Sequence, residues 1–320
     1  MKDFEGRTAF ITGGGSGLGL GLAKVLSEAG CRVVIADIRR EYLDQAMDHF
    51  SDKDVPVHAI QLDVTDREDY VRAADEVEKV FGGPPELLFN NAGVITFGPT
   101  EASTYADWDW MLGVDLHGVI NGMQTFVHRM IKAGKGGYIV SVSSMAAFRG
   151  SPVAAIYSAA KAAVNNIMES YRISLAPYGI GVSVCCPANI KSNIYESIYI
   201  RPEHLKSTGY LFNEDAIASL QHMQRGGMDP VVLAGHIKRG IEENKPYIIP
   251  YPESKPMLES HFQEIIDSIP PVETDPEGVK IRTEAMMDLM KNPGNSFGKA
   301  DPELTWVKDR GPLPTPSEQE

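Results

Sequence analysis

The chain has 320 residues, of which 43% are hydrophobic, so it can bury one substantial core arranged in one or two domains. Its formal net charge of −13 argues against binding to nucleic acid or to an anionic membrane surface. We expect a soluble, cytoplasmic protein, because the N-terminus has no apolar signal region and no apolar run reaches the length of a membrane span.

Strand-like and helix-like patterns alternate along the first 186 residues. Apolar or β-branched runs predict strands at 8–11, 32–36, 57–62, 87–89, 137–142 and 181–186. Helical periodicity predicts helices at 18–28, 41–50, 67–81, 106–133 and 156–178. The strands are near-continuous Val and Ile runs, which is typical of parallel strands buried on both faces. The predicted fold class is α/β, a doubly wound, Rossmann-type parallel sheet with helices on both faces and a C-terminal helical extension.

The pattern changes after Pro187. Residues 189–228 lack clean periodicity and are expected to form a lid over the substrate, because ligands of such sheets bind beyond the carboxyl ends of the strands. A helix should begin after the N-cap Asp229, with Pro230 at its first position, and 247–249 is a last strand. We therefore expect a catalytic domain at 1–250, an extension of one or two helices at 251–292 and a loosely ordered tail at 293–320.

A glycine cluster follows the first strand and opens the first helix. Its spacing is GxxxGxG through Gly13, Gly17 and Gly19, with Ser16 and Leu18 between them. Glycines at such a turn let backbone N–H groups approach a pyrophosphate at a helix N-terminus, where the helix dipole favours negative charge. The cluster predicts a dinucleotide site.

Asp37 ends the second strand, 18 residues after Gly19. An acidic side chain at this position accepts hydrogen bonds from the adenosine ribose and repels the additional phosphate of NADP. Ser16 adds no cation within the loop, so the predicted cofactor is NAD. Arg39 and Arg40 are close enough to pair with a phosphate, but we favour the interpretation that they open a solvated helix.

Tyr157 and Lys161 are four residues apart, so on a helix they share one face. A phenol has a pKa of about 10, and lowering it by about 3 units requires roughly 4 kcal/mol. One ammonium group at about 4 Å supplies about that much at an effective dielectric constant near 20. Tyr157 can then take the proton of a substrate alcohol while its carbon loses a hydride to a nicotinamide.

These motifs occur in the order typical of one family. Thr12-Gly-x-x-x-Gly-x-Gly19, Asp63-Val64, Asn90-Asn-Ala-Gly93, Ser144, Tyr157-x-x-x-Lys161 and Pro187-x-x-Ile190-x-Ser192 resemble the short-chain dehydrogenase/reductase family. The resemblance implies that Ser144, rather than its neighbour Ser143, hydrogen-bonds the substrate oxygen. It further implies that the cofactor's adenine contacts Asp63 and Val64, its ribose lies beside Asn91, and its carboxamide is held by Ile190 and Ser192.

Asp115 departs from the family pattern, which usually has asparagine there. The resemblance implies that this residue holds a water linking the lysine to solvent, largely through its backbone carbonyl. A carboxylate close to Lys161 would offset part of the positive field that activates Tyr157.

A narrower resemblance covers nearly the whole chain. The segments 188–194, 201–202, 247–252 and 261–267 are similar to bacterial Cα-dehydrogenases that oxidise benzylic alcohols of lignin-derived β-aryl ethers. Several side chains either line a roomy apolar pocket or pack only against the lid itself: Met145, Phe148, Tyr195, Tyr199, Tyr210 and Phe212.

The predicted activity is NAD-dependent hydride transfer between a secondary aryl or benzylic alcohol and its ketone, with a small-molecule substrate as partner. An NADP-linked ketoreductase and a dinucleotide-binding regulator with vestigial catalysis are the alternatives. The resemblance implies a homodimer or homotetramer packed through 106–133 and 156–178. No metal is expected, since Cys31, Cys185 and Cys186 resemble buried small side chains and His117 and His128 surface or interface residues.

Overall fold

The computed structural model describes residues 1–211 and 213–291, so Phe212 and the tail predicted at 293–320 lie outside the described residues. Its contacts divide the described chain into two units, Met1–Pro252 and a second unit that begins at Glu253. The first unit holds every residue predicted to bind cofactor or substrate.

The first unit is built on a seven-stranded parallel sheet in the order β3-β2-β1-β4-β5-β6-β7. The chain order reverses between β1 and β4, which makes the sheet doubly wound as predicted. The strands are β1 Thr8–Thr12, β2 Arg32–Asp37, β3 Val57–Gln61, β4 Leu87–Asn90, β5 Gly137–Val142, β6 Ile180–Cys185 and β7 Tyr247–Ile248.

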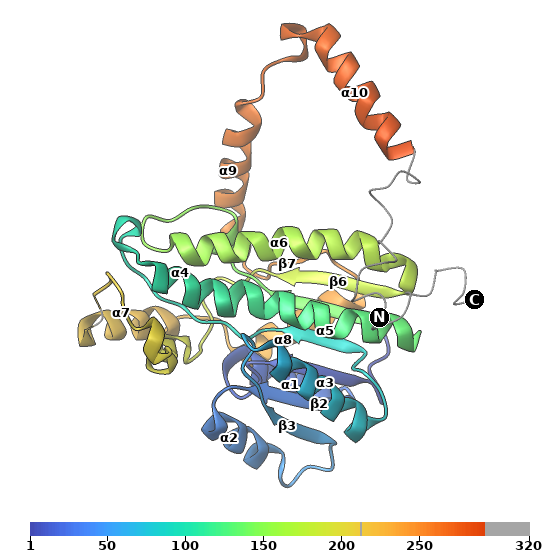
Figure 1. Cartoon of the computed structure of the whole chain (residues 1–320), viewed down its shortest axis with the longest axis vertical. Coiled ribbons are helices and arrows are strands. Elements are labelled where there is room, and N and C mark those ends of the chain that lie inside the picture. The colour runs from blue at the N-terminus through green and yellow to red at the C-terminus, as the bar shows by residue number, and fades with distance from the viewer. Residues whose placement is uncertain (212, 292–320) are drawn as a thin grey trace. The chain divides into compact units, whose positions relative to one another are not determined.

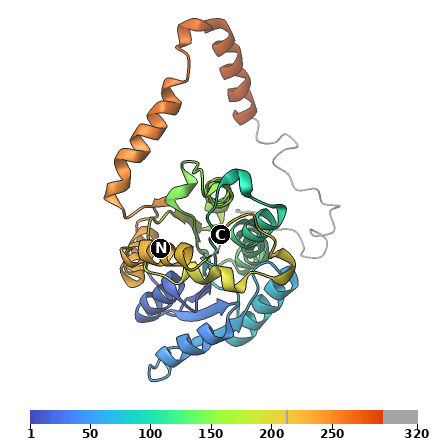
Figure 2. The same cartoon turned by 90° about the vertical axis from the view of Figure 1, so that its left-hand side faces the viewer.

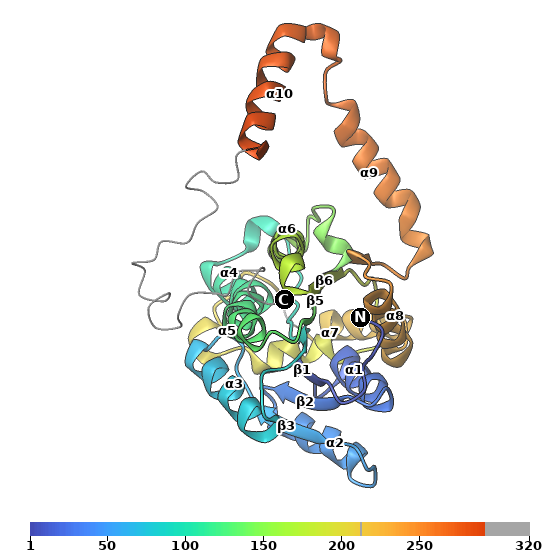
Figure 3. The ribbon, with the colours of Figure 1, turned by 90° about the vertical axis from the view of Figure 1, so that its right-hand side faces the viewer.

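Helices cover both faces of this sheet (Figures 1 and 3). Alternate residues of a strand face opposite sides, and β1 shows this directly. The Phe10 ring packs against Phe126 of α5, with ring centroids 4.7 Å apart, whereas Ile11 joins the core under α1, α2 and α8. The helices of this unit are α1 Gly17–Glu28, α2 Arg40–Phe50, α3 Arg67–Phe81, α4 Tyr105–Leu112, α5 Gly118–Ala133, α6 Ala155–Leu175, α7 Glu214–Arg225 and α8 Pro230–Glu242.

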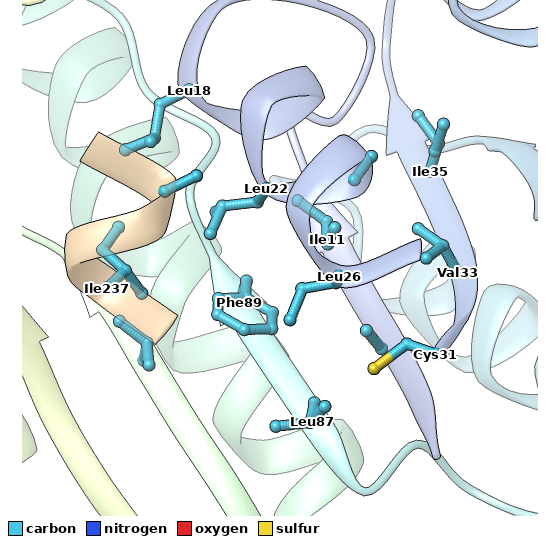
Figure 4. Packing of buried hydrophobic residues seen from close by; sticks show 14 of the residues in the cluster. Ile11, Leu18, Leu22, Leu26, Cys31, Val33, Ile35, Leu87, Phe89 and Ile237 are labelled. Atoms are coloured by element: carbon cyan, nitrogen blue, oxygen red, sulfur yellow. The ribbon is translucent and has the colours of Figure 1, made fainter. Parts of the chain in front are cut away.

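The larger hydrophobic core lies between the sheet and α1, α2 and α8 (Figure 4). Leu22 and Leu26 of α1 are 1% exposed and pack on Ile11 and Phe89 of the strands. Burial of such side chains is worth about 1.5–3 kcal/mol each. This core fixes α1 against β1 and thereby holds the glycine loop between them in place.

The helix predicted over 106–133 is present, since the chain is helical from Tyr105 to Ala133. It contains a π-helical turn at Gly113–His117, which separates α4 from α5 and includes Asp115, whose side chain is fully buried. π-turns insert one extra residue into an α-helix and occur often at functional sites.

The two ends of the segment 189–228 pair with each other, and part of the segment is helical. Ile190 and Met228 form a parallel bridge, in which the Lys191 N–H donates to the Met228 carbonyl at 3.0 Å. The absence of periodicity inferred from the sequence is wrong for its second half, because Asn213 caps α7 by accepting a hydrogen bond from the Ala216 N–H. Figure 2, which views the molecule from the side of α7, shows the yellow ribbon of this segment.

The second unit contains two helices among its described residues, α9 Lys255–Asp267 and α10 Pro276–Lys291. In α10 the Asp275 carboxylate accepts hydrogen bonds from the Gly278 N–H and from Arg282, which stabilises its first turn. None of the helices in the described chain combines the length and the apolar character needed to cross a membrane.

Candidate active site

One cavity of about 770 Å³ lies where the strands β1 to β6 end. Its wall combines residues from the glycine loop, the strand ends, α4, α6 and the segment 189–228. All but one of the predicted site residues line it: Gly13, Ser16, Gly17, Leu18, Asp37, Asp63, Val64, Asn91, Asp115, Ser144, Tyr157, Lys161, Ile190 and Ser192.

Gly19 is the exception, and its role is to let the loop close. A Cβ atom on Gly19 would lie 2.0 Å from the Gly13 carbonyl oxygen, so no other residue fits there. Gly13 itself has φ +60, a left-handed conformation that favours glycine, and its Cβ would lie 2.9 Å from the Ala92 Cα.

The amide groups at the start of α1 fit a pyrophosphate. Ser16 is the N-cap of α1, but its side chain makes no capping hydrogen bond. The first-turn N–H groups therefore remain available for an anion in the cavity. Asn91 shapes this loop by donating its Nδ2 to the carbonyls of Thr12 and Gly13, at 2.9 and 3.2 Å.

The Asp37 carboxylate is held rigidly at the end of β2. It accepts hydrogen bonds from the Gly15 and Arg39 N–H groups, each at 3.0 Å. Burial raises the pKa of Asp37, while these two hydrogen bonds and Arg39 oppose that rise. The remaining lone pairs of the carboxylate are available to the hydroxyls of a ribose.

Arg39 is not simply solvated, which corrects the interpretation favoured from the sequence. It lines the cavity, and its guanidinium stacks on the Tyr42 ring, 3.9 Å from the centroid. Its Nη1 also donates to Glu196 at 2.8 Å. Arg40, in contrast, is exposed and pairs with Asp44 within its own helix, as expected.

Two further cavity residues lie at the carboxyl end of β3. The Asp63 carboxylate accepts hydrogen bonds from the Thr65 N–H and hydroxyl at 2.9 and 2.8 Å. The Val64 carbonyl accepts one from Asn121 of α5 at 2.9 Å. These bonds fix the loop that the family resemblance assigns to the adenine.

Tyr157 and Lys161 of α6 meet Ser144, which follows β5. The Lys161 Nζ lies 5.5 Å from the centroid of the Tyr157 ring, and Tyr157 shares a side-chain hydrogen bond with Ser144. Ser143 points elsewhere, since its hydroxyl donates to the Lys161 backbone carbonyl at 2.9 Å. Ser144 is thus the serine placed beside the phenol, and Ser143 anchors β5 to α6.

Asp115 pairs directly with Lys161 through its side chain. Its Oδ1 lies 3.2 Å from the Lys161 Nζ and accepts a hydrogen bond from the Val94 N–H at 3.1 Å. Within the described chain, its buried Oδ2 has no hydrogen-bond partner. A Cβ on Gly93 would lie 2.8 Å from Oδ1, so glycine at that position makes the close approach of the π-turn possible.

The three buried titratable groups shift one another's pKa values. Burial raises the pKa of Tyr157; Lys161 opposes this rise and Asp115 adds to it. Burial alone would lower the pKa of Lys161, but Asp115 and Tyr157 raise it overall, so the ammonium form is retained. Burial also raises the pKa of Asp115 against the attraction of Lys161. The pKa of Tyr157 thus depends on the balance between burial, Lys161 and Asp115.

The end of the cavity near Tyr157 is apolar, but the side chains that line it differ from those expected. Met145 lies there as proposed, whereas Phe148 packs on Tyr247, Tyr199 is 68% exposed and Tyr210 is buried against Gly98. Further apolar side chains line the cavity that the sequence did not indicate, among them Phe97, Trp110, Val114, Ile200, Leu205 and Met223. Trp110 could have been found only by knowing which face of the 106–133 helix meets the site.

The described residues hold no cluster of His, Cys, Asp and Glu able to bind a metal ion. All three cysteines are free and buried, and burial raises the pKa of Cys31 and that of Cys186 to about 12. They remain neutral thiols at physiological pH and behave as small apolar side chains.

Known proteins resemble this chain in both sequence and structure. The model of the short chain dehydrogenase family matches residues 7–202. A Cα-dehydrogenase of Sphingobium sp. strain SYK-6 is 54% identical over 94% of this chain and 99% of its own length. The apo crystal structure of LigD from the same strain is 49% identical, covers 84% of this chain and 100% of its own, and has a TM-score of 0.72.

A second solved structure contains a cofactor. It is a short-chain dehydrogenase/reductase from Burkholderia phymatum in complex with NAD, 30% identical, with a TM-score of 0.79. It covers 85% of this chain and 98% of its own. These similarities confirm the predicted family and its Rossmann-type fold.

Proposed function

The chain belongs to the short-chain dehydrogenase family, and we propose that it is an NAD-dependent dehydrogenase that oxidises secondary benzylic alcohols to aryl ketones. Membership of the family makes it an oxidoreductase acting on a CH–OH group. The choice of NAD as cofactor and the aryl character of the substrate are what we propose. The observation that carries the proposal is that one cavity is lined by the glycine loop and Asp37, by Ser144 and Tyr157, and by apolar and aromatic side chains.

In the proposed reaction, the nicotinamide accepts the hydride that leaves the carbinol carbon. Ser144 donates a hydrogen bond to the substrate oxygen and so fixes its distance from Tyr157. The Lys161 ammonium stabilises the phenolate form of Tyr157, which takes the hydroxyl proton and becomes a neutral phenol. The proton then passes toward solvent beside Lys161, where the Asp115 Oδ2 is an available acceptor.

Selectivity for NAD is supported by Asp37. Its carboxylate is 8% exposed and oriented by two backbone amides, so it can accept from both ribose hydroxyls without rearrangement. A 2′-phosphate at that position would bring two negative groups into a partly desolvated site.

An aryl substrate is supported by the cavity wall and by the relative. Trp110 and Phe97 supply aromatic surface, and Met145 supplies a polarisable thioether. The Sphingobium relative is a Cα-dehydrogenase that aligns with almost the whole chain, including the extension after residue 252. A second copy of the chain is also proposed to pack on α5 and α6, where Ile173 is 79% exposed, to give a homodimer or homotetramer.

Turnover with a matched set of alcohols tests the proposed function. We expect 1-arylpropanols and guaiacylglycerol-type β-aryl ethers to reduce NAD, and an aliphatic alcohol of equal size to react at least about tenfold more slowly. Faster turnover with the aliphatic alcohol would exclude the aryl assignment. Faster reduction of the ketone with NADPH would favour the ketoreductase alternative, and binding of NADH without turnover would favour a regulator.

A further inference from the structure

A cluster of charged side chains joins the segment 189–228 to the ribose end of the cavity. Arg39 lies at its centre and follows Asp37 by two residues. Its Nε donates to Glu41 at 2.8 Å, and its Nη1 donates to Glu196 at 2.8 Å and to the Tyr42 hydroxyl at 2.9 Å. The Tyr42 hydroxyl also hydrogen-bonds Glu196.

Arg39 is the strongest potential phosphate ligand near Asp37. An arginine fork matches phosphate oxygens and keeps its charge at any physiological pH. Arg39 lines the cavity, and its own N–H binds the Asp37 carboxylate at 3.0 Å. Without other partners, its guanidinium would compensate for Asp37 and accommodate the 2′-phosphate of NADP.

Glu196 lies 157 residues further along the chain and already accepts a hydrogen bond from this guanidinium. We propose that Glu196 is a cofactor-selectivity residue, which occupies the Arg39 guanidinium and thereby excludes the 2′-phosphate of NADP from the ribose site. The inference rests on the proposed dinucleotide site at Asp37. Glu196 itself does not line the cavity, so it acts through Arg39 rather than by contact with the cofactor.

Exposure distinguishes the two carboxylates on Arg39. The Glu41 side chain is 58% exposed, so water screens its pair with Arg39 and the pair contributes little. The side chains of Arg39 and Glu196 are only 20% and 24% exposed, and Tyr42 binds both. A phosphate entering the site must therefore displace Glu196, whereas Glu41 can turn away into solvent.

The test measures dissociation constants of NADH and NADPH by fluorescence for wild type and three variants. Glu196→Gln keeps the size of the side chain and removes its charge. We expect it to tighten NADPH binding by roughly tenfold while NADH binding changes by less than about threefold. Glu41→Gln is the matched control and should alter NADPH binding by less than about threefold. In the double variant Glu196→Gln/Arg39→Ala, the gain in NADPH affinity should disappear.

Unchanged NADPH affinity in Glu196→Gln would overturn the inference, and so would a gain in affinity that persists without Arg39. A loss of binding of both cofactors would also overturn it, since it would show a general structural role for Glu196. The proposed function is judged separately on the wild type. A wild type that prefers NADPH contradicts the NAD assignment, while the change caused by Glu196→Gln still decides the role of Glu196.

Discussion

The Lys161 ammonium lies 3.2 Å from the Asp115 carboxylate, and the two side chains are 4% and 0% exposed. The pair holds the lysine charged beside Tyr157, but it also places an anion within the field that should acidify the phenol. Both effects follow from one departure from the family pattern. The proposed catalysis by Tyr157 therefore depends on how much of the lysine charge Asp115 cancels.

Asp115→Asn should move the pH profile of alcohol oxidation downward. Burial raises the pKa of Tyr157 and Asp115 adds to that rise, so the phenolate needed for oxidation is disfavoured by this anion. Asparagine removes the anion that adds to this shift and keeps an oxygen acceptor for the Val94 N–H. The pH of half-maximal turnover should fall by a measurable fraction of a unit. An unchanged midpoint would contradict the electrostatic argument, and an inactive Asn variant would make Asp115 a catalytic group itself.

Tyr157→Phe should lower turnover by at least about a hundredfold, because it removes the hydroxyl that we propose exchanges a proton with the substrate oxygen. NADH affinity should stay within about threefold of wild type, since the glycine loop and Asp37 are untouched. Tyr171→Phe, on the same helix but hydrogen-bonded to Gln124, is the control and should keep full activity. Substantial turnover by Tyr157→Phe would show that hydride transfer does not use this residue.

Selectivity for NAD should depend on Asp37. We expect wild type to bind NADH at least about tenfold more tightly than NADPH, which corresponds to about 1.4 kcal/mol. Asp37→Asn should reduce that ratio by weakening NADH and removing the repulsion of the 2′-phosphate. Equal affinities in the wild type, measured by titration, would mean that Arg39 leaves Glu196 and binds the phosphate.

The sequence predicts the sheet and the cradle well because their signals are local. The strands β1 to β6 each end within two residues of the predicted position, since buried Val and Ile runs stop at glycines and polar residues. The π-turn around Asp115 was missed because one inserted residue hardly disturbs a 3.6-residue period. Gly113, its first residue, and Gly118, which follows it, mark the place.

Long-range contacts explain the remaining differences. Nothing near Arg39 in the sequence indicates Glu196, so the arginine was interpreted as solvated. The helix α7 has a local signal in the sequence, the N-cap Asn213 followed by the acidic Glu214 and Asp215, but no clean apolar periodicity. The apolar cavity wall comes from elements far apart in the chain, and its composition requires the fold.

The attachment of the segment 189–228 to α4 should depend on a buried ion pair between Arg201 and Asp107. Their Nη1 and Oδ1 are 2.7 Å apart, the side chains are 1% and 0% exposed, and Arg201 also donates to the Leu205 and Ser207 carbonyls. Asp107 additionally accepts the Thr104 N–H in the capping box of α4. The pair thus ties the segment after residue 200 to the helix that carries Trp110.

Asp107→Asn should lower the free energy of unfolding by about 3 kcal/mol, because it leaves the arginine charge buried without a counter-ion. Burial alone would raise the pKa of Asp107, but hydrogen bonds from Thr104 and Arg201 lower it overall. A lowered folded-state pKa stabilises the fold above the unfolded pKa of about 3.9, and this stabilisation is lost as the pH falls. Denaturant unfolding at pH 7 and pH 4 should therefore show a larger difference between wild type and variant at pH 7.

Asp109→Asn, two residues along α4 and exposed, should change stability by less than about 0.5 kcal/mol. Equal stabilities of Asp107→Asn and wild type at pH 7 would show that the pair does not hold the lid.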